Sequence, residues 1–170
     1  MDRLISHARD VACFLKDEFA PSRRAVSLRE VLRELESRLW VECRTSGIAF
    51  ALEMKDDLIV NVDSELLLKA LENLFLNSRD AMPAGGNFIV RAHGTRPPGA
   101  EITVSDSGKG LEAIPVEQLF EPFFTNGKHY AAGLGLSIAK KIVELHGGSI
   151  HAANRNGSPG ARFTITLPSL

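Results

Sequence analysis

Two asparagines spaced four residues apart, Asn73 and Asn77, are the first side chains in this sequence that could do chemistry together. They lie in the segment 63–82, whose composition favours a helix until Pro83 and Gly85 end it. Residues four apart in a helix lie on neighbouring turns of one face, so both amides could reach one ligand or one metal ion. The alternative is a pair of asparagines that are merely solvated.

A second candidate group is the sequence DSGKG, residues 106–110, which follows a predicted strand. It places the carboxylate of Asp106 at the strand end, where it could accept a hydrogen bond from the exocyclic amine of adenine or, at a different edge, of guanine. Gly108 and Gly110 follow, and glycines let a ligand approach the backbone without a Cβ atom in the way. An ordinary Asp-Ser-Gly turn is the alternative.

A third candidate is a phosphate site at the start of a predicted helix, 136–146. Gly133 and Gly135 precede this helix, where free amides and the helix dipole favour an anion. A hinge or a tight turn would also explain the two glycines. Upstream, the sequence LFEPFFT at 119–125 predicts a hydrophobic latch, and the aperiodic segment 125–132 predicts a mobile flap.

The elements that must position these groups follow from hydrophobic periodicity. A capping sequence at 27–30 predicts a helix that ends near Gly47. Alternating apolar residues predict strands at 48–53 and 58–62, a hairpin of 88–93 with 101–105, and a hairpin of 149–154 with 162–167. The expected layout is one twisted, mixed and mostly antiparallel sheet, covered on one face by three helices.

The N-terminal residues form a separate segment. Residues 1–19 carry an apolar stripe typical of an amphipathic helix, which Pro21 ends before a short polar joint. We place a boundary there, between an N-terminal segment of residues 1–24 and a domain of residues 25–170. Such a helix usually packs on another segment or a second subunit, and packing on its own domain is the alternative.

Composition excludes several classes of protein. The chain has 170 residues, of which 44% are hydrophobic, which suits one globular domain with a small appendage. Cys13 and Cys43 stand alone, so neither a disulfide framework nor a zinc site is indicated. A net charge of −1 provides no basic field for nucleic acid. Because the isolated cysteines fit a reducing compartment, we expect a cytoplasmic location. No apolar run reaches membrane-spanning length, so any membrane anchor of the full-length protein would lie outside this chain.

In combination and in this order, the motifs resemble those of the catalytic and ATP-binding domain of sensor histidine kinases. The similarity extends over residues 26–168. It comprises the family's N box at ENLFLN (72–77), its first glycine box at DSGKG (106–110), its phenylalanine box at FEPFF (120–124) and its second glycine box at GLGLS (133–137). The sequences NSRDAM and PFFT further resemble the nitrogen-regulation subgroup of these kinases.

This resemblance implies an α/β sandwich of the Bergerat type that binds ATP, with Mg²⁺ as cofactor. Asp106 would hold the adenine amine, and Asn77 would coordinate Mg²⁺ bridging the phosphates. Asn73 would support the metal and phosphate end, while Gly108 and Gly110 would make room for the base.

The same resemblance assigns the remaining residues of the site. Phe123 and Phe124 would anchor the lid. Lys128 could neutralise the γ-phosphate when the lid is closed, although a solvated lysine is the alternative. The phosphate would be cradled by the second glycine box, that is Gly133, Leu134 and Gly135. Outside the site, the helix at 1–19 looks like the second helix of the family's dimerisation hairpin.

Kinase chemistry is preferred to hydrolysis. Related ATPases, such as gyrase, carry a glutamate one turn before the metal asparagine, where it can activate water; here that position is Asn73, and an amide cannot accept a proton at neutral pH. Glu72 lies about 100° around the helix and should point elsewhere.

A phosphoacceptor histidine in this family precedes an acidic residue, but His7 precedes Ala8. The other histidines are interpreted as surface or capping residues: His93, His129, His146 and His151.

The sequence therefore predicts the catalytic domain of a protein-histidine kinase, which binds Mg·ATP and transfers the γ-phosphoryl group to a histidine outside this chain. Its expected partners are ATP or ADP, the dimerisation and phosphoacceptor domain of the same kinase, and a response regulator; the full-length protein would be a homodimer. One alternative is an anti-sigma-type serine kinase, which would not need the helix at 1–19. The other is a nucleotide-binding interaction module, which would be expected to lack Asn77.

Overall fold

The computed structural model describes residues 20–95, 99–111, 115–124 and 133–168, so the expected helix at 1–19 and the flap at 125–132 lie outside it. The helices are α2 (Leu28–Thr45), α3 (Ser64–Ala81), α4 (Gly135–Leu145) and a short 3-10 helix, η1 (Val116–Phe120). The strands are β1 (Arg24–Ser27), β2 (Ile48–Met54), β3 (Ile59–Val62), β4 (Gly86–Thr95), β5 (Gly99–Asp106), β6 (Ser149–Asn154) and β7 (Ala161–Pro168).

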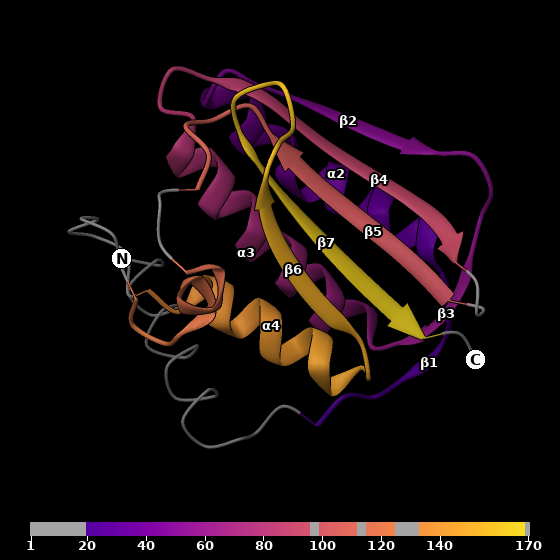
Figure 1. Ribbon diagram of the computed structural model, residues 1–170. Helices are drawn as coiled ribbons and strands as arrows, with labels where there is room; N and C mark the ends of the chain where they lie inside the picture. The colour runs from indigo at the N-terminus through magenta and orange to yellow at the C-terminus, as the bar shows by residue number, and fades with distance from the viewer. Residues whose placement is uncertain (1–19, 96–98, 112–114, 125–132, 169–170) are drawn as a thin grey trace, which may run out of the picture.

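Five strands form one sheet in the order β2-β4-β5-β7-β6. β2 runs parallel to β4, and the other neighbours are antiparallel. Figure 1 shows α2, α3 and α4 on one face of this sheet. The expectation of a mixed, mostly antiparallel sheet with three helices on one face is confirmed, as are the helix limits to within one or two residues.

The expected single sheet was wrong in one respect, because the strand predicted at 58–62 does not join it. β3 instead pairs with β1 in a separate two-stranded antiparallel sheet. β1 begins at Arg24, within the stretch interpreted as a polar joint. Its four residues are half-buried or exposed and lack a core-facing alternation, which is why no strand was expected there.

The core lies between the sheet and the helices. Apolar residues that alternate along the strands meet the apolar stripe of α3, as the period-two and helical patterns predict. Phe75 of α3 packs edge-to-face on Phe88 of β4, with ring centroids 5.1 Å apart. The other large, fully buried side chains include Leu32, Leu35, Leu67, Leu71, Leu74, Ile102, Ile138 and Phe163.

α3, which carries both asparagines of the predicted site, and α4, which begins at Gly135, are joined where α3 begins and α4 ends. Asp63 caps α3, because its Oδ1 accepts from the amides of residues 65–66, and its Oδ2 accepts from the amide of Ser22. The buried ring of His146 accepts from the Asp63 amide through Nε2, at 2.9 Å, while its Nδ1 lies 2.7 Å from the Ile142 carbonyl oxygen. His146 is thus a capping histidine at the end of α4, one of the two expected roles, and it is buried.

Candidate nucleotide-binding site

Asp106, the last residue of β5, is 1% exposed, and its carboxylate is held by three donors. Oδ1 accepts from the amides of Gly108, at 2.9 Å, and Ala161, at 3.1 Å, while Oδ2 accepts from Ser78 Oγ at 3.0 Å. Each carboxylate oxygen can accept about two hydrogen bonds. Among the described residues, Oδ2 therefore keeps one acceptor position, which suits the exocyclic amine of a base.

Ser78, which bonds the carboxylate of Asp106, is a residue of the candidate site that the sequence analysis did not single out. It lies on α3 within the apolar stripe and is fully buried. A serine in such a stripe signals a buried hydroxyl that needs a partner. Its partner could not be identified from spacing, because Asp106 is 28 residues away and is brought to it only by the fold.

The two asparagines of α3 lie on successive turns, as predicted, and both are half-buried. Asn73 Nδ2 donates to the Lys69 carbonyl at 3.0 Å, and its Oδ1 faces the start of α4, since a Cβ atom at Gly135 would lie 3.2 Å from it. Asn77 is one turn further on, next to Ser78. Asn73 therefore lies next to the start of α4. Asn77 lies one turn further along α3, towards Ser78 and the carboxylate of Asp106.

The start of α4 has the geometry expected of an anion site. Gly133 has a positive φ of 65°, and the side chain of Leu134 is buried, so Leu134 can face a ligand only through its backbone. The helix begins with the bond from the Ile138 amide to the Leu134 carbonyl, at 2.8 Å. Like any helix, α4 leaves the amides of its first turn, 135–137, without intrahelical acceptors.

The phenylalanine segment is tied to the start of α4. The Phe123 amide donates to the Gly133 carbonyl at 3.0 Å, and Phe123 has a φ of +64°, a strained value for a residue that is not glycine. Phe120 is the buried member, whereas Phe123 is 58% exposed and Phe124 is half-buried. Phe120 is therefore the buried aromatic residue of this segment, and the expectation that Phe123 and Phe124 anchor the lid stays a prediction. Lys128 lies outside the described residues, so its expected contact with phosphate stays a prediction.

Packing alone requires glycine at two positions of the DSGKG loop. A Cβ atom at Gly108 would lie 2.7 Å from the Ala81 carbonyl oxygen at the end of α3. Gly110 has a φ of +79°, and its Cβ would lie 2.6 Å from Asn154 Oδ1. The expectation that both glycines make room for a base stays a prediction, because their contacts with α3 and β6 already explain them.

Glu72 points away from Asn73, as the helical geometry predicts. Its carboxylate lies 3.6 Å from Nη1 of Arg38 on α2. Partial burial raises the pKa of Glu72, and the positive charge of Arg38 opposes this shift. Glu72 is therefore directed to the interface between α2 and α3 and is not placed to activate a water molecule beside Asn73 and Asn77.

We expect the substitution Glu72→Gln to stabilise the domain at pH 7 by less than about 1 kcal/mol. Because the pKa of Glu72 is raised in the folded state, folding favours the protonated carboxyl group over the carboxylate. The native chain therefore becomes less stable as the pH rises through the raised pKa and the side chain ionises, whereas glutamine stays neutral. The gain should therefore shrink towards zero at about pH 3, below the ordinary pKa of a glutamate, where Glu72 is protonated in both the folded and the unfolded chain. Urea unfolding of both chains at the two pH values checks this, and a difference independent of pH would contradict it.

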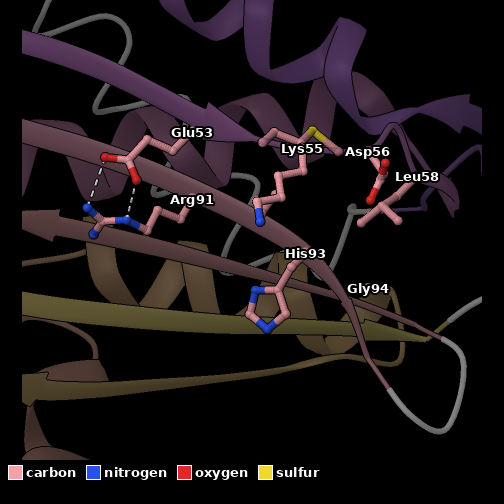
Figure 2. A pocket seen from close by; sticks show the side chains of 9 residues that line it. Glu53, Lys55, Asp56, Leu58, Arg91, His93 and Gly94 are labelled. Atoms are coloured by element: carbon pink, nitrogen blue, oxygen red, sulfur yellow. Dashed lines mark hydrogen bonds and ion pairs between the residues drawn. The ribbon is translucent and has the colours of Figure 1, made fainter.

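A hollow of about 620 Å³ lies away from these residues, at the other end of β4 (Figure 2). In the register of β4 with β5, Phe88 pairs with Asp106 near the candidate site, whereas His93, which lines the hollow, pairs with Glu101. Two of the charged side chains that line the hollow, Glu53 and Arg91, are already paired with each other, at 2.7 and 2.9 Å, as Figure 2 shows. It is distinct from the candidate nucleotide site.

The buried carboxylate of Asp106 keeps one acceptor position, and the asparagines of α3 and the glycines at the start of α4 lie beside it. This arrangement of groups on an α/β sandwich is that of a nucleotide-binding domain. The family model described as "Histidine kinase-, DNA gyrase B-, and HSP90-like ATPase" matches residues 62–170, and the chain belongs to this family. No helix in the described ranges is long and apolar enough to cross a membrane.

Similar proteins point to one branch of this family. Sensor histidine kinase ZraS of Escherichia coli O157:H7 is 42% identical over 109 residues, which are 64% of this chain and 23% of that protein. The catalytic domain of histidine kinase ThkA matches with a TM-score of 0.76 and 29% identity, over 87% of this chain and 96% of that one. A structure of ThkA with the response regulator protein TrrA matches with a TM-score of 0.82 and 26% identity, over 99% and 49%. The chain spans about a quarter of the length of the curated relatives it matches.

Proposed function

We propose that this chain is the catalytic domain of a sensor histidine kinase, which binds Mg·ATP and transfers the γ-phosphoryl group to a histidine on a dimerisation domain outside the chain. The observation that carries this proposal is the carboxylate of Asp106, which three donors hold in place and which retains one acceptor position. The likeness to the ThkA catalytic domain over nearly its whole length supports it.

The residues present suit a magnesium ion that arrives with the nucleotide. Mg²⁺ prefers oxygen ligands and keeps several waters and substrate phosphates, so it needs few protein ligands. Asn77 would supply an amide oxygen, with Asn73 beside it, and the described residues contain no cluster of three or more His, Cys, Asp or Glu that would form a separate metal site. When bound, the ion would neutralise phosphate charge, while the protein positions the reactants.

Phosphoryl transfer suits the site better than hydrolysis does. The position one turn before Asn77 holds an amide, Asn73, and the neighbouring carboxylate of Glu72 is turned towards Arg38. No general base for water therefore lies beside the metal asparagine among these residues. A serine kinase of the anti-sigma type or a nucleotide-dependent interaction module stays an alternative for the same pocket.

The expected partners follow from the same proposal. The full-length protein would pair this domain, residues 25–170, with a dimerisation and phosphoacceptor domain and act as a homodimer in the cytoplasm, with any membrane anchor outside this chain. The similarity to ThkA bound to TrrA supports a response regulator as the next acceptor of the phosphoryl group. Membership of the nitrogen-regulation subgroup stays a prediction.

Calorimetric titration of the chain with ADP and with a non-hydrolysable ATP analogue, with and without Mg²⁺, tests this proposal. We expect both nucleotides to bind, and the triphosphate analogue to bind more tightly when Mg²⁺ is present, because the metal screens the phosphate charge. GDP serves as the control for the base and should bind weakly or not at all. A chain that binds no adenine nucleotide would contradict the proposal.

A further inference from the structure

The turn between β6 and β7 lies against the loop 106–111, which begins with Asp106, the residue whose carboxylate is proposed to bind adenine. The last pair of this hairpin is Asn154 with Ala161, so residues 155–160 form a six-residue connection, longer than a tight hairpin needs. Figure 1 shows this connection at the arrowhead end of β5, where Asp106 lies. We propose that Asn154 and Arg155 are positioning residues, which fix the two ends of the loop 106–111 and thereby set how Asp106 faces the base.

Asn154 fixes the far end of the loop. Its Oδ1 accepts from the Leu111 amide at 2.7 Å, and its Nδ2 donates to the Leu111 carbonyl at 3.3 Å, so one side chain engages both backbone groups of one residue. Gly110 allows this close approach, because a Cβ atom there would lie 2.6 Å from Asn154 Oδ1. The two residues that bond are 43 positions apart in the sequence.

Arg155 fixes the near end. Its Nη1 donates to the backbone carbonyl of Asp106 at 3.0 Å and also approaches the Pro159 carbonyl at 3.4 Å. The Arg155 amide donates to the Gly160 carbonyl at 2.9 Å, which closes the turn. Gly160 has a φ of +116° and packs so closely that a Cβ atom there would overlap the Asp106 carbonyl oxygen. The next amide, of Ala161, binds Asp106 Oδ1 directly.

The other side of the loop rests on α3. The Lys109 amide donates to the Ala81 carbonyl at 3.3 Å, and Gly108 packs against the same residue. The loop is therefore held between the end of α3 and the turn, while the start of α4, which would take the phosphates, makes no described bond to Asn154 or Arg155. Loss of the turn contacts should consequently weaken recognition of the base more than recognition of the phosphates.

This inference rests on the proposed function, and its test separates the two. Binding of ADP and of purine riboside diphosphate, which lacks the exocyclic amine, is measured for the native chain and for Asn154→Ala, Arg155→Ala and Arg155→Lys. Asn156→Ala, a change at an exposed position of the same turn, is the matched control. Far-ultraviolet circular dichroism verifies the fold of each variant.

The affinity for ADP should fall by about 5- to 20-fold in each alanine variant, as the loss of one or two hydrogen bonds predicts. The affinity for purine riboside diphosphate should fall less, so the preference for ADP shrinks. Arg155→Lys, which can still donate to the Asp106 carbonyl, should retain most of the preference, and Asn156→Ala all of it.

Each other outcome has one meaning. If the native chain binds ADP but both alanine variants keep its preference for ADP, the positioning role is overturned, even if their affinities for both nucleotides fall together. Should Asn154→Ala fail to fold, the comparison of Arg155→Ala with Arg155→Lys decides the question alone. If the native chain binds neither nucleotide, the proposed function itself has failed.

Discussion

The substitution Asp106→Asn is expected to remove the preference for adenine nucleotides while leaving the fold intact. Asparagine has the same shape, so its Oδ1 can still accept from the amides of Gly108 and Ala161, and its Nδ2 can donate to the hydroxyl of Ser78. The group facing the base then becomes a donor, and the adenine amine, also a donor, loses its acceptor. A lost hydrogen bond to a charged group predicts about 10- to 100-fold weaker binding of ADP.

Titration of ADP and purine riboside diphosphate against both chains measures this effect. The two nucleotides should bind the Asp106→Asn variant with similar affinity, because neither then gains from the amine. Ser78→Ala is the control, since it removes one of the three donors but keeps the carboxylate, and its loss of ADP affinity should stay below about tenfold. An Asp106→Asn variant that binds ADP as tightly as the native chain would show that the base lies elsewhere.

The features of the site that could be predicted from the sequence are those set by local spacing. The four-residue interval placed Asn73 and Asn77 on one face of α3, and the strand pattern that ends at Asp106 placed its carboxylate at the end of a strand. Periodicity likewise predicted α2, α3 and α4 and both hairpins, because burial imposes a period of 3.6 residues on a helix and of two on a strand.

The features that could not be predicted depend on contacts between distant residues. Ser78 meets Asp106 across 28 positions, and Arg155 reaches the same residue across 49. In the sequence, Ser78 looks like one polar residue in an apolar stripe, and Arg155 like a residue of a solvated turn. β1 was missed for a related reason, because a four-residue strand without core-facing alternation gains its pairing only from β3.

In the phenylalanine segment, the motif did not predict which side chains are buried. The structure buries Phe120 and leaves Phe123 mostly exposed, and the expected anchoring of the lid by Phe123 and Phe124 stays a prediction, because residues 125–132 lie outside the described ranges. The Phe123 backbone, with its positive φ and its bond to Gly133, is nevertheless the link between this segment and α4. Spacing alone could not distinguish a side-chain anchor from a backbone link.

The substitution Asn77→Ala should abolish the effect of Mg²⁺ on binding of the triphosphate and reduce phosphoryl transfer by at least about 100-fold. Asn77 is half-buried, and its amide oxygen is the proposed ligand of Mg²⁺. Because a metal ion contributes several kcal/mol of charge stabilisation in the transition state, loss of this ligand should slow transfer. Affinity for ADP without metal should change little, because the contacts of Asp106 do not involve Asn77.

Asn77→Asp is the matched control for this prediction, because a carboxylate also offers oxygen to Mg²⁺ and should restore the dependence on the metal. Binding of the ATP analogue is measured with and without Mg²⁺, and transfer is measured to a phosphoacceptor domain added to the chain. If Asn77→Ala keeps the native response to Mg²⁺, the ion is held by phosphates and waters alone. Equal loss in the alanine and aspartate variants would instead mean that the site needs the neutral amide of Asn77, since aspartate preserves an oxygen but replaces the N–H groups with a negative charge.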